Sequence, residues 1–256
     1  MADSVLPSAR WHSLLLAFQF LTRIPMPDTG VLDNRTLGRS LLWYPLVGAT
    51  IGALLWLAQA LLAGVLPQWP WVQGALLLLL WVVLTGGLHL DGLADSADAW
   101  AGGLGDRERT LALMKDPTCG PSAVVWLVLV LLLKAALLSA VVASAAGWLV
   151  LVPMLARSAI PLLFMTTPYV RPGGLGEVLA AELPRRELRH LLLLVVVLTL
   201  LLGSPAWLAL LAGAGAFLGL RALMCRRIGG TTGDTAGAMV ELLEVTLLAG
   251  LLIGLH

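Results

Sequence analysis

Three aspartates recur at helical spacing in the segment 86–100, which reads GGLHLDGLADSADAW. Asp91, Asp95 and Asp98 stand at positions i, i+4 and i+7, so a helix with 3.6 residues per turn places them along one narrow stripe. Like charges at this spacing repel one another unless a cation lies between them. Mg²⁺ is the simplest such cation, because the imidazoles and thiols of a zinc site are not clustered here. The stripe predicts a metal or phosphate site, and the alternative is a solvated acidic face.

A second acidic group lies in the segment 229–244. Asp234 follows a glycine-framed pair of threonines that ends in Thr232, while Glu241 and Glu244 enter an otherwise apolar terminal segment. Each such acid costs about 2.5–3.5 kcal/mol at the bilayer centre, so it needs a polar partner or a cation. We expect the two acidic groups to converge on one or two Mg²⁺ ions. A simple helix N-cap is the alternative role for Asp234.

Cationic side chains complete the predicted site. Lys115 precedes a turn framed by proline and glycine, and Arg157 lies inside an apolar segment, where a cation is a candidate for contact with an anionic substrate. His89 is a candidate general base, with a hydrogen-bonded structural histidine as the alternative. The predicted catalytic residues are Asp91, Asp95, Asp98, Asp234, Lys115 and His89. The predicted metal ligands are Asp91, Asp95, Asp98, Asp234, Glu241 and Glu244. The predicted substrate-binding residues are Arg23, Lys115, Arg157, Arg226, Arg227 and Thr232.

The composition is that of an integral membrane protein. Of the 256 residues, 59% are hydrophobic and only 12% are charged, and the mean hydropathy is +0.92. These values lie outside the usual range of soluble domains. The net charge is +1 and no basic stripe with interleaved aromatic residues is present, which argues against a nucleic-acid partner. We therefore predict one integral-membrane domain, residues 1–256, with the lipid bilayer as its partner, and the sequence is also compatible with a homo-oligomer.

Long apolar segments predict an all-α polytopic bundle of about seven transmembrane helices. The expected spans are 41–66, 71–90, 122–146, 148–165, 191–203, 205–224 and 240–255. The apolar segment 11–21 is short and lacks a cleavage pattern, so we interpret it as a retained interfacial or partly inserted helix.

The loops predict the orientation of the bundle. The turns 67–70, 143–147 and 203–205 contain no lysine or arginine, whereas the alternate loops are rich in them. By the positive-inside rule the charged loops are cytoplasmic. We therefore expect a multi-pass protein of the cell inner membrane with its catalytic loops and active site on the cytoplasmic side.

Several strings occur in an order that resembles the cobalamin-5′-phosphate synthase family, also called the adenosylcobinamide-GDP ribazoletransferases. The resemblance covers nearly the whole chain, and the string GGLHLDGLAD at 86–95 is its most specific part. The turn 117–121, which includes Cys119, is less typical of the family. The strings that carry the resemblance are FLTRIP at 20–25, WYPLVG at 43–48, TGGLHLDGLAD at 85–95, MKD at 114–116, AR at 156–157 and GGTTGDTAGA at 229–238.

The resemblance implies the last assembly step of cobalamin. The 3′-hydroxyl of α-ribazole, or of α-ribazole 5′-phosphate, would attack the phosphorus attached to the cobinamide aminopropanol of adenosylcobinamide-GDP and expel GMP, with Mg²⁺ required. The product would be adenosylcobalamin or its 5′-phosphate. In this scheme the metal is held by Asp91, Asp95, Asp98 and Asp234, and the leaving GMP is stabilised by Lys115 or an arginine.

Two other functions remain as alternatives. The CDP-alcohol phosphotransferases also use an Asp-Gly-x-x-Ala string with Mg²⁺ on a membrane helix, but here Asp95 follows Ala94 where that family has arginine, and the downstream Gly-x-x-x-Asp-x-x-x-Asp spacing is missing. A secondary transporter would also place acids and glycines in broken helices. It should show inverted repeats, whereas the two acidic groups of this chain differ in sequence and spacing.

Overall fold

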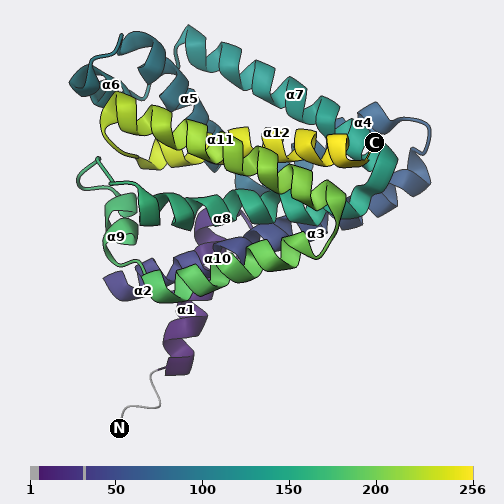
Figure 1. Cartoon of the computed structure of the whole chain (residues 1–256), viewed down its shortest axis with the longest axis horizontal. Helices are drawn as coiled ribbons and strands as arrows, with labels where there is room; N and C mark the ends of the chain where they lie inside the picture. The colour runs from purple at the N-terminus through teal and green to yellow at the C-terminus, as the bar shows by residue number, and fades with distance from the viewer. Residues whose placement is uncertain (1–5, 31–32, 256) are drawn as a thin grey trace.

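The computed structural model describes residues 6–30 and 33–255, and these residues form a bundle of helices without a strand (Figure 1). The predicted all-α membrane bundle is therefore confirmed. The elements are α1 Leu6–Leu21, α2 Asn34–Ser40, the short 3₁₀ helix η1 Leu41–Trp43, α3 Tyr44–Val65, α4 Pro70–Thr85, α5 Leu88–Gly102, α6 Arg107–Leu113, α7 Pro121–Ala145, the 3₁₀ helix η2 Ala146–Val150, α8 Leu151–Thr166, α9 Leu175–Ala181, α10 Arg185–Leu200, α11 Ser204–Ile228 and α12 Gly233–Leu255.

Four stretches are long and apolar enough to cross a membrane, namely Asn34–Val65, Pro121–Thr166, Ser204–Ile228 and Gly233–Leu255. The helices α4 and α5 add a fifth if they are counted together as one broken span, since they meet at 91°. The stretch Pro121–Thr166 contains both α7 and α8, because the backbone leaves helical geometry at Ala145 (φ −165°, ψ 83°) and η2 joins the two helices. The predicted count of about seven spans thus stays a prediction.

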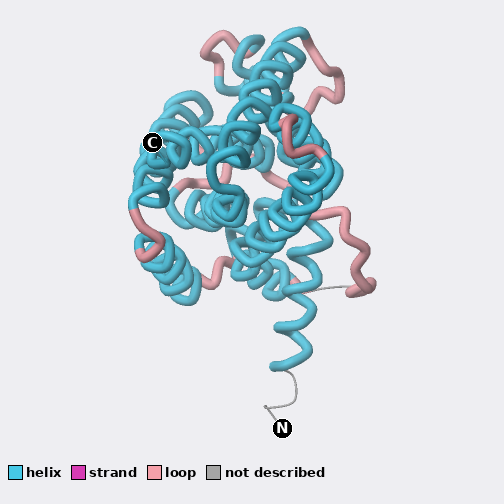
Figure 2. The backbone as a smooth tube through the Cα atoms, turned by 90° about the vertical axis from the view of Figure 1, so that its right-hand side faces the viewer, coloured by secondary structure: helices cyan, strands magenta, loops and turns pink. Residues whose placement is uncertain are grey.

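Helix α12 lies at the centre of the bundle and packs against α5, α7, α8 and α11. Most of its residues are buried, including two glutamates. In Figure 2 most helices are seen nearly end on, so they share a common direction. Leucines on the outside of the bundle are exposed, such as Leu61, Leu132 and Leu211, as expected for a surface that faces lipid.

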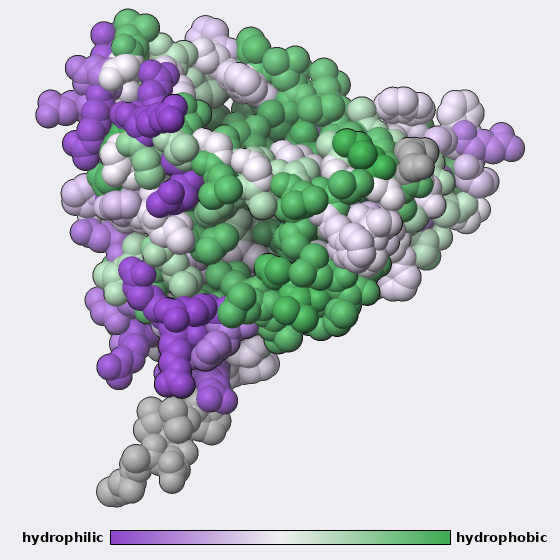
Figure 3. Space-filling model, viewed as in Figure 1, coloured by the Kyte–Doolittle hydropathy of each residue, from purple (hydrophilic) through white to green (hydrophobic). Residues whose placement is uncertain are grey.

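Hydrophilic side chains gather at one end of the molecule. Figure 3 shows them on the left of the view, over α2, α6 and α9, while apolar residues cover most of the remaining surface. This polar end also carries the loops that follow α5 and α8. The segments that bear the predicted catalytic residues therefore share one end of the bundle.

The sharp bend between α4 and α5 rests on two consecutive glycines. Gly86 and Gly87 adopt left-handed backbone geometry, with φ values of 64° and 71°. Glycine takes this conformation without the steric cost that a side chain imposes. A Cβ atom on Gly86 would also collide with the side chain of Arg23. The bend turns α5 so that its acidic motif lies beside the first residues of α12.

Candidate active site

The acidic motifs meet where α5 crosses the start of α12. Gly92 makes this close approach possible, because a Cβ atom at this position would lie 2.6 Å from the backbone oxygen of Asp234. On α12, a Cβ atom on Gly237 would lie 3.4 Å from the Cα atom of His89. The small residues between the acids thus admit the backbone of a neighbouring helix. The crossing brings Asp91 and Asp95 next to Asp234, as the sequence predicted for these three residues.

Two adjoining cavities open on this crossing, and Asp91 lines both. The first has a volume of 460 Å³, and its polar lining includes His89, Asp91, Lys115, Arg171 and Asp234. The second has a volume of 560 Å³, and its charged lining consists of Arg23, Asp91, Asp95 and Asp98. Both volumes lie in the range of small-molecule sites. Carboxylates and cations therefore line two neighbouring cavities that share Asp91.

The pKa of Asp95 shows how the acidic residues of this cluster affect one another. The residue lies on α5, outside the four stretches that qualify as membrane spans. Burial raises the pKa of its carboxyl, and the charges of Asp91 and Asp234 add to the effect, so that the pKa reaches about 6. Arg171 lowers this pKa, but it does not offset burial and the charges of the neighbouring carboxylates. The cluster therefore favours the binding of a further cation.

Arg171 forms an ion pair with Asp234, and sequence reasoning missed this arginine as a site residue. A short parallel pairing of the backbone holds it in place: the amide of Val170 donates to the carbonyl of Thr231 at 2.9 Å, and the amide of Thr231 donates to the carbonyl of Pro168 at 2.8 Å. The segment after α8 is thereby tied to the segment before α12. The signal in the sequence was a lone arginine soon after an apolar span, which does not reveal its partner.

Asp98 has a different role from the other acids of its motif. One of its carboxylate oxygens accepts a hydrogen bond from the amide of Gly120 at 2.5 Å, and the other accepts one from the amide of Ala123 at 2.9 Å. Gly120 is the N-cap residue of α7 and Ala123 lies in its first turn, where backbone N–H groups lack partners within the helix. Asp98 thus caps α7. Each oxygen of Asp98 already accepts one backbone hydrogen bond, so the structure gives this residue a capping role, and its predicted role as a metal ligand stays a prediction.

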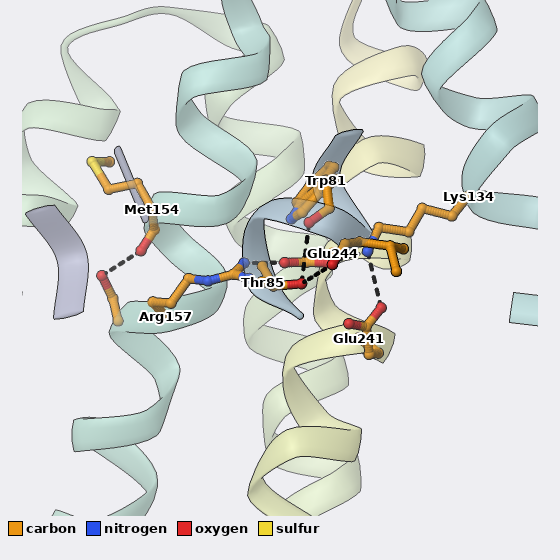
Figure 4. A network of polar contacts seen from close by, with 9 residues as sticks. Trp81, Thr85, Lys134, Met154, Arg157, Glu241 and Glu244 are labelled. Carbon is orange, nitrogen blue, oxygen red and sulfur yellow. Dashed lines mark hydrogen bonds and ion pairs between the residues drawn. The ribbon is translucent and has the colours of Figure 1, made fainter. Parts of the chain in front are cut away.

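The structure does not bring Glu241, Glu244 or Arg157 to the two cavities. Lys134 binds Glu241 at 2.9 Å and also pairs with Glu244, which in turn pairs with Arg157 (Figure 4). Glu241 follows Asp234 by seven residues, which is about 10 Å along the helix axis. The carboxylates of Asp234 and Glu241 therefore do not bind the same ion. All four charged side chains are at most 5% exposed. We call Lys134, Arg157, Glu241 and Glu244 the buried quartet.

Some of the remaining predicted residues line the two cavities, and the others do not reach them. Lys115 and His89 line the first cavity, and Arg23 lines the second. Thr232 is fully buried, and its hydroxyl lies within 3.4 Å of the hydroxyl of Thr235, so it does not reach either cavity. Arg226 and Arg227 lie in the last turn of α11 and line neither cavity. Of the predicted substrate-binding residues, the structure gathers Arg23 and Lys115.

Aromatic rings form part of the wall of the first cavity, and sequence reasoning did not identify them as a group. Phe20 and Tyr44 stack with their ring centroids 6.4 Å apart, and Phe164 and Tyr169 meet edge to face at 5.9 Å. These residues come from α1, α3, α8 and the loop after α8. Tyr44 and Phe164 are buried, so Phe20 and Tyr169 are the rings available for stacking with a planar ligand group.

In the part of the chain that the structure describes, no three His, Cys, Asp or Glu residues are arranged to hold a metal ion by themselves. Asp91 and Asp95 nevertheless form no ion pair with any cation among the described residues. Mg²⁺ is usually bound by one or two carboxylates, with waters and substrate phosphates as the other ligands. The donor set therefore fits Mg²⁺ that binds together with a phosphate-bearing substrate.

Comparisons with known proteins agree on one family. The family model for cobalamin-5-phosphate synthase matches residues 13–252. An adenosylcobinamide-GDP ribazoletransferase of Pseudomonas putida is 58% identical over 239 residues, which cover 92% of this chain and 96% of the relative. The enzymes of the same name from Stutzerimonas stutzeri and Ectopseudomonas mendocina are 57% and 56% identical, and the matches cover 93% and 94% of this chain and 96% and 98% of those relatives. No solved structure matches the chain.

Proposed function

We propose, because the chain belongs to the cobalamin-5-phosphate synthase family, that it is an adenosylcobinamide-GDP ribazoletransferase. Its substrates are adenosylcobinamide-GDP and α-ribazole or α-ribazole 5′-phosphate. Its products are adenosylcobalamin, or adenosylcobalamin 5′-phosphate, and GMP. The reaction is the final assembly step of cobalamin.

In this reaction one phosphorus–oxygen bond forms and another breaks. The 3′-hydroxyl oxygen of the ribazole bonds to the phosphorus that carries the cobinamide aminopropanol. The bond from this phosphorus to the bridging oxygen breaks, and GMP leaves with the bonding electrons. The hydroxyl proton passes to a base, for which the carboxylates of the two cavities and the imidazole of His89 are the available groups.

The observation that supports this function best is the meeting of opposite charges around Asp91. A diphosphate needs cations to hold its oxygens, and Lys115 and Arg171 supply them in the first cavity. Arg23 supplies another in the second cavity. The negative charge of the departing GMP is best stabilised by these same side chains. Phe20 and Tyr169, the accessible rings of the first cavity, provide a surface for the base of a nucleotide.

We also propose that Mg²⁺ is required. Asp91 and Asp95 are the ligands that fit it best, and the carboxylate of Asp234 is a further ligand once it separates from Arg171. The metal would neutralise charge on the diphosphate and help to orient it. The support for this proposal is the crowding of like charges around Asp95, together with the finding that no cation in residues 6–30 and 33–255 forms an ion pair with Asp91 or Asp95.

We propose that the protein lies in the cell inner membrane with this site on the cytoplasmic side. The gathering of hydrophilic residues at one end of the bundle supports the proposal. So does the excess of lysine and arginine in the loops of that end, which the positive-inside rule assigns to the cytoplasm.

Turnover by the purified protein in lipid vesicles tests the function. Adenosylcobinamide-GDP is supplied with α-ribazole or its 5′-phosphate, and GMP release is followed with Mg²⁺ or with EDTA. We expect release in the presence of both substrates and Mg²⁺, and loss of release with EDTA. Turnover that persists in EDTA would overturn the metal requirement alone. Use of a CDP-alcohol, or substrate uptake without GMP release, would overturn the transferase assignment.

A further inference from the structure

The walls of the two cavities at the acidic crossing differ in polarity. Besides its charged side, the first cavity has an apolar side, to which α1, the loop after α8 and α9 contribute. Phe20 and Leu175 are 38% and 44% exposed, and Tyr169 and Pro172 are also accessible, so these side chains can touch a ligand. Of these four side chains, only that of Tyr169 carries a hydrogen-bonding group. The first cavity therefore offers an accessible apolar surface beside its charges.

The backbone next to this apolar surface uses polar groups within the chain. The amide of Gly173 donates to the carboxylate of Glu177 at 2.7 Å, and the carbonyl of Gly174 accepts a hydrogen bond from the amide of Glu177 at 3.0 Å. The start of α9 packs directly on the ring of Tyr169, since a Cβ atom on Gly176 would lie 2.5 Å from that ring. A polar ligand edge placed here would lose hydrogen bonds with water and find few new partners.

The second cavity offers both donors and acceptors of hydrogen bonds. Arg23 is exposed, and no carboxylate in the described ranges lies within 4.0 Å of its guanidinium. The hydroxyl of Thr118 donates to the carboxylate of Asp116 at 2.6 Å, and its oxygen can accept a further hydrogen bond. The carboxylate of Asp95 adds acceptors. A ligand with several polar groups therefore finds partners in the second cavity.

The two bases of the proposed reaction differ in the same way as the two cavities. The dimethylbenzimidazole of α-ribazole carries two methyl groups on its outer edge and no hydrogen-bonding group there. Guanine carries an N–H group, an amino group and acceptor atoms on its edges. A polar group that is buried without a partner costs free energy. The apolar side of the first cavity therefore suits the methylated base, and the second cavity suits the guanylate.

The geometry of phosphoryl transfer also calls for two separate sites. The attacking oxygen and the leaving oxygen lie roughly in line on opposite sides of the phosphorus. Asp91 lines both cavities, so a phosphorus held beside it would be within reach of ligands in each. An attacker in one cavity and a leaving group in the other would satisfy the in-line requirement.

We propose, on the basis of the transferase function above, that the first cavity binds the acceptor and the second binds the guanylate. The dimethylbenzimidazole ring lies against Phe20, Tyr169 and Leu175, and its 3′-hydroxyl points toward the phosphorus beside Asp91. As the bond from this phosphorus to the bridging oxygen breaks, GMP leaves with the bonding electrons into the second cavity. Arg23 then pairs with the negative charge that GMP has gained.

Protection of thiols from N-ethylmaleimide shows which cavity each ligand occupies. Cys119 is exposed and lines the second cavity, so it is a natural probe there once Cys225→Ser has removed the other cysteine. Leu175→Cys, combined with Cys119→Ser and Cys225→Ser, places a single probe in the first cavity. We expect GMP with Mg²⁺ to slow the labelling of Cys119 at least fivefold and α-ribazole to leave it unchanged. For Leu175→Cys we expect the opposite.

The matched control is Leu104→Cys in the same cysteine-free background. Position 104 is 79% exposed and lines neither cavity, so neither ligand should change its labelling rate. Each rate is measured by mass spectrometry with and without ligand, at ligand concentrations that saturate or inhibit turnover by the wild type. Reversed protection, or equal protection of both probes by one ligand, in a protein whose wild type releases GMP would overturn this assignment alone. A wild type that releases no GMP would overturn the proposed function.

Discussion

The acidic cavities and the buried quartet both contain carboxylates facing cations, yet they differ in balance and in access to solvent. The quartet has two cations and two carboxylates, all buried and all paired with one another. The cavities hold Asp91 and Asp95, which form no ion pair within the described part of the chain and line a space that a ligand can enter. Charges that satisfy one another hold helices together, whereas charges left without partners are available to a ligand. The following predictions test this contrast.

The largest expected effect concerns the quartet. Glu244→Gln leaves Lys134 and Arg157 in the bundle with one carboxylate between them, which should cost about 3–5 kcal/mol of stability. Thermal unfolding of the purified variant in detergent measures the loss. The double variant Lys134→Met/Glu241→Gln removes one charge of each sign and should lose far less. Equal losses in the two proteins would show that charge balance does not govern the quartet.

Neutralising the acids of the cavities should affect turnover and spare the fold. We expect Asp91→Asn, Asp95→Asn and Asp234→Asn to lower the rate of GMP release roughly a hundredfold to a thousandfold, because charge stabilisation at the reacting phosphate is lost. Their unfolding temperatures should stay near that of the wild type. Glu108→Gln is the control, since this exposed acid of α6 lines neither cavity. Wild-type rates in the three variants would remove these acids from the mechanism.

The crossing of α5 and α12 is expected to matter for geometry. In Gly92→Ala the new methyl group would lie 2.6 Å from the backbone oxygen of Asp234, so the two helices must move apart. A displacement of this kind costs up to about a hundredfold in rate. GMP release measures it. Gly64→Ala on α3 is the comparison, because its methyl group would meet no atom within 4 Å. Normal turnover by Gly92→Ala would mean that the crossing tolerates a wider separation.

Lys115 should contribute to substrate binding. Lys115→Ala removes one charged contact to the diphosphate and should raise KM for adenosylcobinamide-GDP roughly tenfold. Lys115→Arg keeps the charge and should recover part of the effect. Initial rates at several substrate concentrations distinguish KM from kcat. If KM is unchanged in Lys115→Ala, the lysine is a solvated side chain.

The smallest effect is expected at Asp98. Asp98→Ala removes the cap of α7 and should cost about 1 kcal/mol of stability. Its loss of turnover should be much smaller than that of Asp91→Asn. Unfolding temperature and GMP release, measured on the same preparation, test both statements. A loss of turnover as large as that of Asp91→Asn would return Asp98 to the set of metal ligands.

The sequence predicted the helical membrane bundle and part of the site, because both depend on local patterns. The spacing of Asp91 and Asp95 fixes their common helix face, and long apolar segments require helices in a membrane. Asp234 was also predicted to lie beside them, although more than a hundred residues separate the two acidic segments. The reason was that both segments were expected to bind the same metal ion.

Partners that lie far apart in the chain could not be predicted. The cost of a carboxylate in an apolar segment showed that Glu241 and Glu244 need a cation, but not that Lys134 and Arg157 provide it. Likewise nothing near Asp98 in the sequence points to the amides of α7, and Arg171 precedes Asp234 by 63 residues. Such pairings are decided by how helices pack, and a single sequence does not encode that packing in a readable form.

Under the proposed function, the binding of substrate would exchange the partners of the ion pair between Arg171 and Asp234. A diphosphate that comes with Mg²⁺ offers an anion to the arginine and a cation to the aspartate at the same moment. The diphosphate alone would leave Asp234 without a cation, and Mg²⁺ alone would leave Arg171 without an anion. The two together would give each residue a partner of opposite charge. The enzyme would thus discriminate between the metal complex of its nucleotide and the bare nucleotide before any bond is broken.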